Sequence, residues 1–217
     1  MLIAGIDEAG RGPCLGPLVM AITVIEKEDE EKLIELGVKD SKITPIKVRE
    51  DQYEKIKKIV SEEATSHIEA EELDELMKRK SLNEIEAMHA AKLLNGLETK
   101  PDVVYVDSPD VVMEEFANRI RKYIAFKTKI ISEHKADANY PIVSAASILA
   151  KVERDAAIKK LSVEFGEIGS GYSHDAVTIK FLKKYFLKHN TFPVFARKSW
   201  QTIKVMQEER FQKKLFE

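Results

Sequence analysis

The chain has 217 residues, enough for one domain with a substantial core or for a domain with a small helical appendage. Lys and Arg number 35 against 37 Asp and Glu, so the net charge is only −2, which excludes a strongly basic protein. Any nucleic-acid partner would therefore bind at a local basic patch. The single cysteine, Cys14, excludes a fold held by disulfides. No apolar run reaches the ~20 residues of a membrane helix, and Asp7 and Glu8 interrupt the place of a signal peptide, so we expect a cytoplasmic protein without membrane contact.

The first half of the chain alternates apolar strands with helices. The capping-box pair of Ser81 and Glu84 predicts where one helix begins, and Asn95-Gly96 predicts where it ends. Gly37 is placed to stop an earlier helix. The elements expected in this half are strands over 2–6, 18–25 and 64–70 and helices over 29–36, 45–61 and 82–94.

The second half begins with strands and ends with helices only. Its expected elements are strands over 103–106 and 127–132 and helices over 113–123, 142–165, 175–189 and 200–214. Gly166, Gly169 and Gly171 predict a flexible loop before the last two helices. The pattern indicates an α/β sheet with a helical C-terminal part, which by itself says nothing about function.

Acidic residues directly follow two of the expected strands. The strand over 2–6 runs into Asp7 and Glu8, and the strand over 103–106 runs into Asp107. The C-terminal edge of an α/β sheet commonly carries the site, so neighbouring strands would bring these carboxylates together. Asp137 follows another expected strand and is a fourth candidate. Acids at strand ends can also be solvated or cap the next helix, and this alternative stays open.

A cluster of carboxylates predicts a hard divalent cation. Carboxylates held close together raise one another's pKa values, and Mg²⁺ or Mn²⁺ relieves the repulsion through oxygen ligands. Two such ions can activate a water and stabilise the leaving oxygen in phosphodiester hydrolysis. The five histidines lack HxH and HExxH spacings, one cysteine cannot build a zinc cluster, and a GxSxG motif is absent from the sequence.

Residues 7–16 form the glycine-rich segment DEAGRGPCLG. A dinucleotide-binding loop would place its third glycine one position before Gly16 and would open a helix, whereas two prolines and a strand are expected here. Gly10 and Gly12 instead bracket Arg11. Glycines let a backbone approach a sugar–phosphate chain, and arginine offers a fork for phosphate. A plain turn with a surface arginine is the alternative.

The helix expected over 142–165 carries small hydroxyls and cations on one face. Ser144, Ser147, Lys151 and Arg154 recur at steps of three, four and three. Such a face fits a nucleic-acid backbone running alongside, with phosphates contacted by the two cations. The solvated face of an amphipathic helix is the alternative.

Three further residues are candidate substrate contacts. Lys42 and Lys135 are placed to contact phosphates. Tyr172, beside Gly171, can stack on a sugar or base and offer its hydroxyl to a ribose 2′-OH. A tyrosine packed within its loop is the alternative.

These segments together resemble the type 2 ribonuclease H family, the ribonuclease HII proteins, in the archaeal form. The matching segments keep the family's order and span nearly the whole chain. They are GIDEAGRGP at 5–13, GPLV at 16–19, DSK at 40–42, YVDSPD at 105–110, EHKAD at 133–137, VSAASILAKVERD at 143–155 and GSGY at 169–172.

The resemblance implies a ribonuclease H-like fold, with a mixed five-stranded sheet flanked by helices. It implies a catalytic domain over 1–172 and a C-terminal helical region over 173–217 packed on it. The carboxylates implied to hold two Mg²⁺ or Mn²⁺ ions are Asp7, Glu8, Asp107 and Asp137. Gly10-Arg11-Gly12, with Tyr172, would recognise the RNA-to-DNA junction through the 2′-OH.

The implied substrates are RNA–DNA hybrids and DNA with single ribonucleotides, cut 5′ of the ribonucleotide to leave 5′-phosphate and 3′-hydroxyl ends. Two positions depart from the family's pattern. Ile43 stands where a second lysine is frequent, and Ser173-His174 stands where Pro-Ser is frequent.

We expect a monomer. For its last residues, 212–217, a frayed helix end is favoured, and docking on a sliding clamp is the alternative. Two other functions stay open. One is a DNA-cutting nuclease or strand-transfer enzyme of the same superfold, and the other is a hybrid-binding module without catalysis.

Overall fold

The chain folds as two compact units that interleave along the sequence. The computed structural model describes residues 1–38 and 45–215, with side chains described as far as residue 209. Unit 1 comprises Met1–Ala9, Val19–His67 and Ser81–Glu153, and unit 2 comprises Gly10–Leu18, Ile68–Lys80 and Arg154–Glu217. This division differs from the predicted boundary after residue 172, which stays a prediction.

Unit 1 is built on a five-stranded mixed sheet in the order β3-β2-β1-β4-β5. β1 pairs antiparallel with β2 and parallel with β4, and β4 pairs parallel with β5. The strands are β1 Leu2–Ala9, β2 Leu18–Glu26, β3 Glu62–Ile68, β4 Val103–Asp107 and β5 Lys129–Glu133. The predicted mixed five-stranded sheet is confirmed, and the strand predicted over 64–70 corresponds to β3, which lies at one edge of the sheet.

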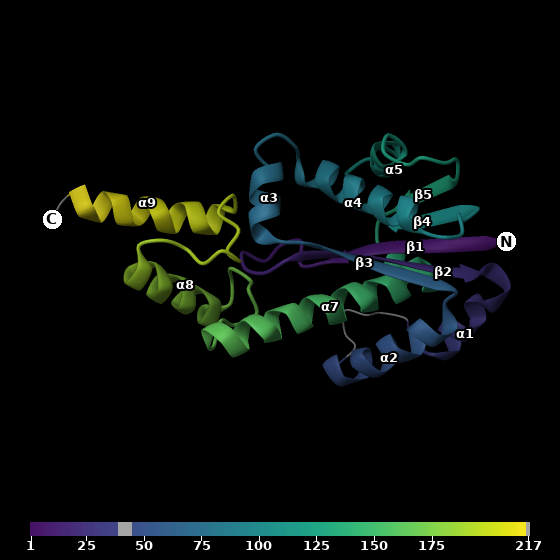
Figure 1. The fold of residues 1–217 in the computed structure, drawn as a ribbon, viewed down its shortest axis with the longest axis horizontal. Coiled ribbons are helices and arrows are strands. Elements are labelled where there is room, and N and C mark those ends of the chain that lie inside the picture. Colours follow the sequence, from purple (N-terminus) through teal and green to yellow (C-terminus); the bar gives the residue numbers. More distant parts are fainter. Residues whose placement is uncertain (39–44, 216–217) are drawn as a thin grey trace. The chain divides into compact units, whose positions relative to one another are not determined.

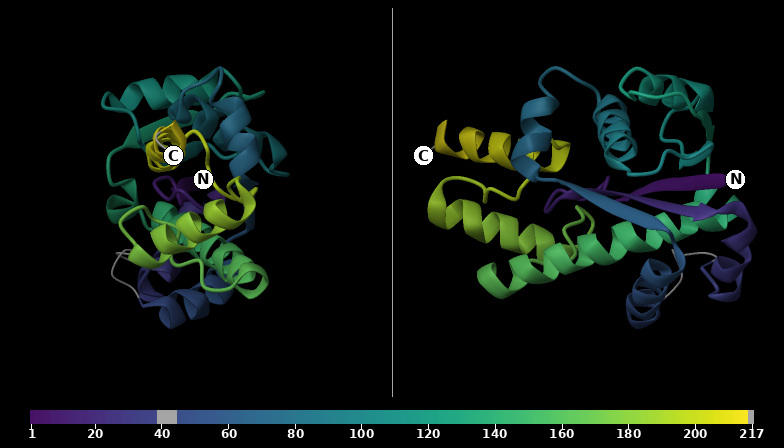
Figure 2. Two further views of the ribbon diagram at one scale, coloured as in Figure 1. Left: turned by 90° about the vertical axis from the view of Figure 1, so that its left-hand side faces the viewer. Right: turned by 45° about the vertical axis from the view of Figure 1, so that its right-hand side comes forward.

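Helices cover both faces of this sheet (Figures 1 and 2). One face packs on the first half of α7, with α1 and α2 beside it, and the other face carries α4 and α5. The helices that lie in this unit, wholly or in part, are η1 Lys27–Asp29, α1 Glu30–Glu35, α2 Ile46–Ile59, α4 Leu82–Gly96, α5 Met113–Arg121, α6 Ala136–Asn139 and α7 Pro141–Phe165. The predicted N-cap is confirmed, since the Ser81 side chain accepts a hydrogen bond from the Glu84 amide at 3.2 Å. The Glu84 carboxylate accepts hydrogen bonds from Arg119 and Tyr123 and does not complete the capping box.

Unit 2 combines the glycine-rich segment with the last helices. Its helices are α3 Ala70–Leu76, α8 Ala176–His189, α9 Gln201–Leu215 and the end of α7 from Arg154. An aromatic and aliphatic core that includes Leu15, Ile168, Leu182 and Phe195 packs α8, α9 and the end of α7 on the glycine-rich segment.

Sequence patterns missed two helices, α3 and α6. α6 has only four residues, and α3 is a seven-residue helix in an acidic segment, so neither shows a clear apolar period. Within the described residues, no helix combines the length and apolarity that crossing a membrane requires.

Candidate active site

Two neighbouring parallel strands bring the first pair of acids together. Ile6 of β1 pairs with Val106 of β4, so the next residues, Asp7 and Asp107, lie side by side. β1 does not end at Asp7 as predicted, because its antiparallel pairing with β2 continues to Ala9. Asp7 is therefore a strand residue whose side chain is only 5% exposed.

The start of α7 packs directly on the face of β1 that carries Asp7. A Cβ built on Gly5 would lie 2.4 Å from the carbonyl carbon of Ile142, so only glycine allows this approach. The hydroxyl of Thr23 in β2 donates to the Ile142 carbonyl at 2.8 Å. Side chains two residues apart share a strand face, so Asp7 points toward the next turns of α7, where Ser147 donates a hydrogen bond to it.

The pKa of the Asp7 carboxyl group is shifted by its surroundings. Its pKa is raised to about 7, mainly by burial and in part by the charges of Asp107 and Asp137, while the hydrogen bond from Ser147 works in the opposite direction. Lys151 in turn donates to the Ser147 hydroxyl at 3.0 Å. Asp107 and Asp137 therefore both lie within electrostatic reach of Asp7, and Lys151 is connected to Asp7 through the Ser147 hydroxyl.

The loop after β5 connects Asp137 to Asp107. Lys135 adopts a left-handed conformation with φ 56°, which turns the chain so that the Ala136 amide donates to Asp107 Oδ1 at 2.7 Å. Asp137 follows within α6 and is only 7% exposed. Glu8 is half-exposed, and the pleat directs it to the side of β1 opposite Asp7, so its place among the acids stays a prediction.

The chemistry of these residues fits hard divalent cations. In the described part of the chain, no three His, Cys, Asp or Glu side chains stand arranged around a point that could hold a metal ion. The acids nevertheless offer only oxygen ligands, and mutual repulsion helps to raise the pKa of Asp7. A bound cation would remove that repulsion, which is the condition under which carboxylates bind Mg²⁺ or Mn²⁺.

The predicted hydroxyl and cation face of α7 lies mostly inside the protein. Ser144 is 1% exposed and donates to the Val38 carbonyl, Ser147 is fully buried, and Arg154 is 8% exposed. These side chains form hydrogen bonds within the protein, because the face of α7 that carries them packs on other elements of the unit to which each side chain belongs. Lys151 is half-exposed.

Within unit 2, a buried arginine holds the glycine-rich segment. Arg197 donates to the carbonyl oxygens of Gly16 at 2.9 Å, Arg11 at 3.1 Å and Gly10 at 2.6 Å. Its side chain is fully buried, and burial lowers the pKa of its guanidinium to about 10. The sequence did not single out Arg197, because three backbone acceptors distant in sequence leave no local pattern.

Tyr172 lies against the same segment. Its ring is 3.6 Å from the position that a Cβ would take on Gly12, and the Arg154 guanidinium lies 5.3 Å from the ring centre. The amides of Cys14 and Leu15 both donate to the Gly171 carbonyl, at 2.8 and 3.2 Å. The Gly-rich loop predicted to be flexible is thus tied at several points, and Tyr172 and Gly12 come together as the sequence suggested.

Asp175 ties the other side of this loop. Its carboxylate accepts hydrogen bonds from the Ser170 amide at 2.6 Å and hydroxyl at 2.7 Å, and also caps α8 through the Val177 amide at 2.9 Å. These bonds hold the pKa of Asp175 well below its usual range. Two predicted features lie outside the described residues: Lys42 with its neighbour Ile43, and the side chains of the C-terminal tail over 210–217.

The sheet order and the neighbouring aspartates of its two central strands define an enzyme of the ribonuclease H-like class. A family model described as Ribonuclease HII matches residues 4–203. Ribonuclease HII of Pyrococcus abyssi is 46% identical over 210 residues, which are 96% of this chain and 92% of that protein. The chain belongs to the ribonuclease HII family and is an endoribonuclease of the hydrolase class.

Solved structures agree with this assignment. Ribonuclease H2 from Pyrococcus horikoshii OT3 superposes with a TM-score of 0.92 at 43% identity, covering 98% of this chain and 100% of that chain. Ribonuclease HII of Archaeoglobus fulgidus, solved in a complex with PCNA, gives 0.85 at 40% identity, covering 93% and 96%. Bst-RNase HIII in complex with Mn²⁺ gives 0.82 at 18% identity, covering 98% and 71%, and shares the fold.

Proposed function

We propose that this enzyme cuts the RNA strand of RNA–DNA hybrids and cuts 5′ of single ribonucleotides in DNA, leaving 5′-phosphate and 3′-hydroxyl ends. Membership of the ribonuclease HII family supports the hybrid as substrate. The observation that carries the proposal is the convergence of Asp107 and Asp137 on the buried Asp7, where burial and, in part, these two charges raise the pKa of Asp7 to about 7. Acids held in this way are poised to bind cations beside a phosphodiester.

Asp7, Glu8, Asp107 and Asp137 would hold two Mg²⁺ or Mn²⁺ ions, and the Mn²⁺ complex of the distant Bst-RNase HIII is consistent with this. When bound, such ions supply an activated water and neutralise charge on the scissile phosphate. The role of the surrounding residues is to orient the carboxylates. Ser147 and the Ala136 amide hold the Asp7 and Asp107 carboxylates by hydrogen bonds.

Recognition of the ribose would fall to Gly10-Arg11-Gly12 and Tyr172. The short distance between Gly12 and the Tyr172 ring supports a joint role, and the carbonyl contacts of Arg197 keep the glycine backbone in place. A ribose 2′-OH is a donor and an acceptor, so backbone groups and a tyrosine hydroxyl can distinguish it from deoxyribose.

Exposed lysines would contact phosphates on the substrate. Lys135 is exposed and Lys151 half-exposed, and Lys42 completes the proposed set. We assign the buried Ser144, Ser147 and Arg154 to positioning, since Ser147 and Lys151 lead to Asp7 and Arg154 braces the Tyr172 loop.

The decisive experiment is cleavage of matched duplexes with and without one ribonucleotide, in Mn²⁺, in Mg²⁺ and in chelator. The unchanged protein should cut only ribose-containing duplexes and only with metal, and Asp7→Asn should abolish cleavage while leaving duplex binding largely intact. Full activity of Asp7→Asn would refute the metal scheme. Cutting of the all-DNA duplex would favour the DNA nuclease of the same superfold.

Tyr172→Phe tests ribose recognition separately. The variant keeps the ring beside Gly12 and loses only the hydroxyl, so it should lose activity at a lone ribonucleotide more than on a long hybrid. Equal losses on the two substrates would count against a role at the junction.

We also propose that the C-terminal tail docks on a sliding clamp, as the PCNA complex of the Archaeoglobus fulgidus relative suggests. Deleting residues 212–217 should abolish co-elution with an archaeal PCNA while leaving cleavage of short duplexes unchanged. Unchanged co-elution would contradict the proposal.

A further inference from the structure

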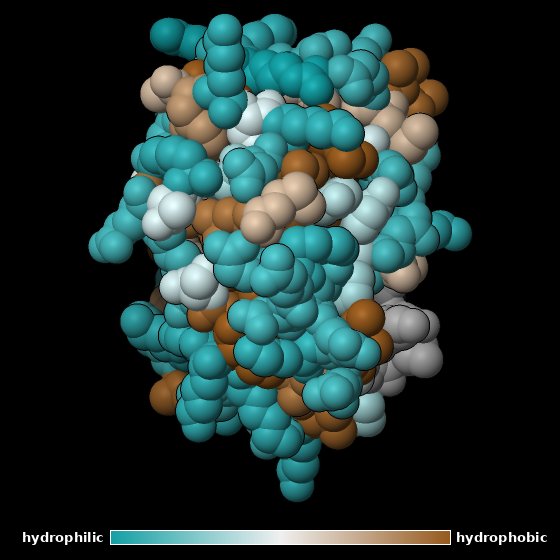
Figure 3. Space-filling model, turned by 90° about the vertical axis from the view of Figure 1, so that its right-hand side faces the viewer, coloured by the Kyte–Doolittle hydropathy of each residue, from teal (hydrophilic) through white to brown (hydrophobic). Residues whose placement is uncertain are grey.

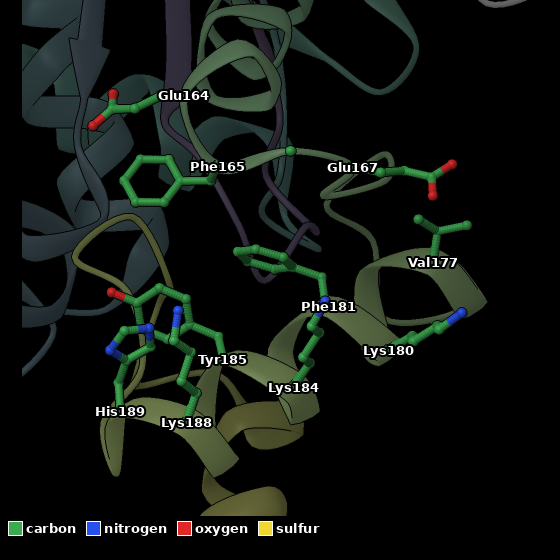
Figure 4. Close-up of a pocket in the computed structure, with 11 residues that line it drawn as sticks. Glu164, Phe165, Glu167, Val177, Lys180, Phe181, Lys184, Tyr185, Lys188 and His189 are labelled. Atoms are coloured by element: carbon green, nitrogen blue, oxygen red, sulfur yellow. The ribbon is translucent and has the colours of Figure 1, made fainter.

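Helix α8 concentrates positive charge in a chain that is otherwise balanced. Its fourteen residues include four lysines and no acid, whereas the whole chain carries a net charge of −2. All four lysines are exposed. We call three of them, Lys180, Lys184 and Lys188, the α8 lysine row. They border one side of a hollow of about 520 Å³ formed with the end of α7 and the loop after it, and Figure 4 shows them following one another along the helix.

The spacing of the row suits one strand of a nucleic acid. Residues four apart lie on one helix face and advance by ~6 Å. Two nucleotides of one DNA strand advance by ~6.8 Å along the duplex axis. Three lysines in this register can therefore follow alternate phosphates of a single strand.

The charge of the row is not compensated within the described part of the chain. Lysines elsewhere, such as Lys27, Lys55 and Lys78, pair with a nearby carboxylate. None of the row's three ammonium groups has such a partner among the described residues, although Glu164 and Glu167 border the same hollow. The fourth lysine, Lys183, does not line this hollow and borders another one together with the carboxylate-bearing Glu209, so we leave it out of the row.

The aromatic rings of the hollow favour contact with a backbone over stacking on bases. Phe165 and Phe181 face the hollow in Figure 4, but both also pack on Phe195, with ring centres 4.7 and 6.1 Å apart. A base would have to compete with these internal contacts. Figure 3 views the molecule from the side that carries the N-terminus, where apolar side chains lie only in small groups among hydrophilic ones.

We propose that the α8 lysine row binds the phosphodiester backbone of the duplex that flanks the cleavage point. The proposal rests on the proposed function, because it assumes that the enzyme engages a duplex longer than the scissile step. Opposite charge, exposure and matching spacing carry it. The row would add affinity without sequence preference, since phosphates carry no base information.

The test compares two triple variants that lose the same charge. The first changes Lys180, Lys184 and Lys188 to Gln. The control changes three exposed lysines of unit 1 to Gln. These lysines lie near the C-terminal ends of α4 and α5 and the N-terminal end of β5. Asp107 lies at the opposite end of the parallel strands. The control residues are Lys92, Lys122 and Lys127.

Binding to a labelled duplex with one ribonucleotide is measured by fluorescence anisotropy in EDTA over a range of salt concentrations. Each lost phosphate contact lowers the slope of log K against log salt by ~0.9, so the α8 variant should lose ~2–3 in slope. At ~0.1 M salt its affinity should fall at least ~10-fold, while the control variant keeps both values. Unchanged thermal melting would show that α8 remains folded.

Equal slopes and affinities in the two triple variants would overturn the proposal, and the row would then be a solvated face or a contact for an acidic protein. Shortening the duplex on one side of the ribonucleotide should abolish the difference between the variants; a difference that survives shortening on either side would refute the flanking position. Cleavage in Mn²⁺ distinguishes the two proposals. A protein that binds through α8 yet cuts neither hybrid nor embedded ribonucleotide refutes the proposed function alone.

Discussion

Replacing Arg197 with methionine tests whether this side chain maintains the glycine-rich segment. Methionine has a similar length and tolerates burial, but it cannot donate to the carbonyls of Gly10, Arg11 and Gly16. A buried carbonyl that loses its donor costs ~1–3 kcal/mol, so three of them would cost ~3–9 kcal/mol. Methionine would also remove an unfavourable buried charge. The fall of the Arg197 pKa from 12.5 to about 10 corresponds to ~3 kcal/mol at neutral pH.

The net expectation for Arg197→Met is a loss of ~3 kcal/mol in the free energy of unfolding. In a protein of this size such a loss lowers the melting temperature by ~6–12 °C. Lys198→Met is the matched control, because it removes an exposed cation one residue away. It should melt like the unchanged protein in a calorimetric scan.

Arg197→Met should also raise KM for a duplex with one ribonucleotide, since the backbone at Gly10 and Gly12 would lose its support. Arg197→Lys should have a KM between those of Arg197→Met and the unchanged protein, because one ammonium group cannot reach the three carbonyls that the forked guanidinium contacts. If Arg197→Met and Lys198→Met melted within error of each other, the bracing role would be refuted.

Three further predictions concern unit 1. The Asp7 carboxyl keeps its proton up to pH ~7 in the folded protein but only up to pH ~3.8 in the unfolded chain, so the free energy of unfolding falls as pH rises between these values. Asp7→Asn should therefore stabilise the metal-free protein at pH 8 by up to ~4 kcal/mol, and equal shifts of the melting temperature at pH 4 and pH 8 would contradict this. Gly5→Ala should cost more than ~3 kcal/mol by urea unfolding, because its Cβ would lie 2.4 Å from the Ile142 carbonyl carbon, and a stable variant would show that α7 can move away. Lys135→Gly should change the free energy of unfolding by less than ~1 kcal/mol, because glycine adopts the left-handed conformation without strain but also increases the conformational freedom of the unfolded chain. The affinity of this variant for a duplex should fall, and an unchanged affinity would exclude a phosphate contact by Lys135.

The sequence by itself was sufficient for the elements with strong local signals. The N-cap at Ser81, the apolar strands before Asp7 and Asp107 and the long helix after Pro141 all depend on neighbouring residues, so they could be recognised without the fold. The family motifs likewise marked the candidate acids and the glycine-rich segment.

Only the tertiary structure decided which polar side chains face inward. Ser144, Ser147 and Arg154 looked like a surface stripe because helical periodicity reports a shared face and not what covers that face. Arg197 could not be recognised, since its three carbonyl partners lie more than 180 residues away in the chain. The raised pKa of Asp7 likewise depends on burial and on charges contributed by separate strands and loops, which exist together only once the chain has folded.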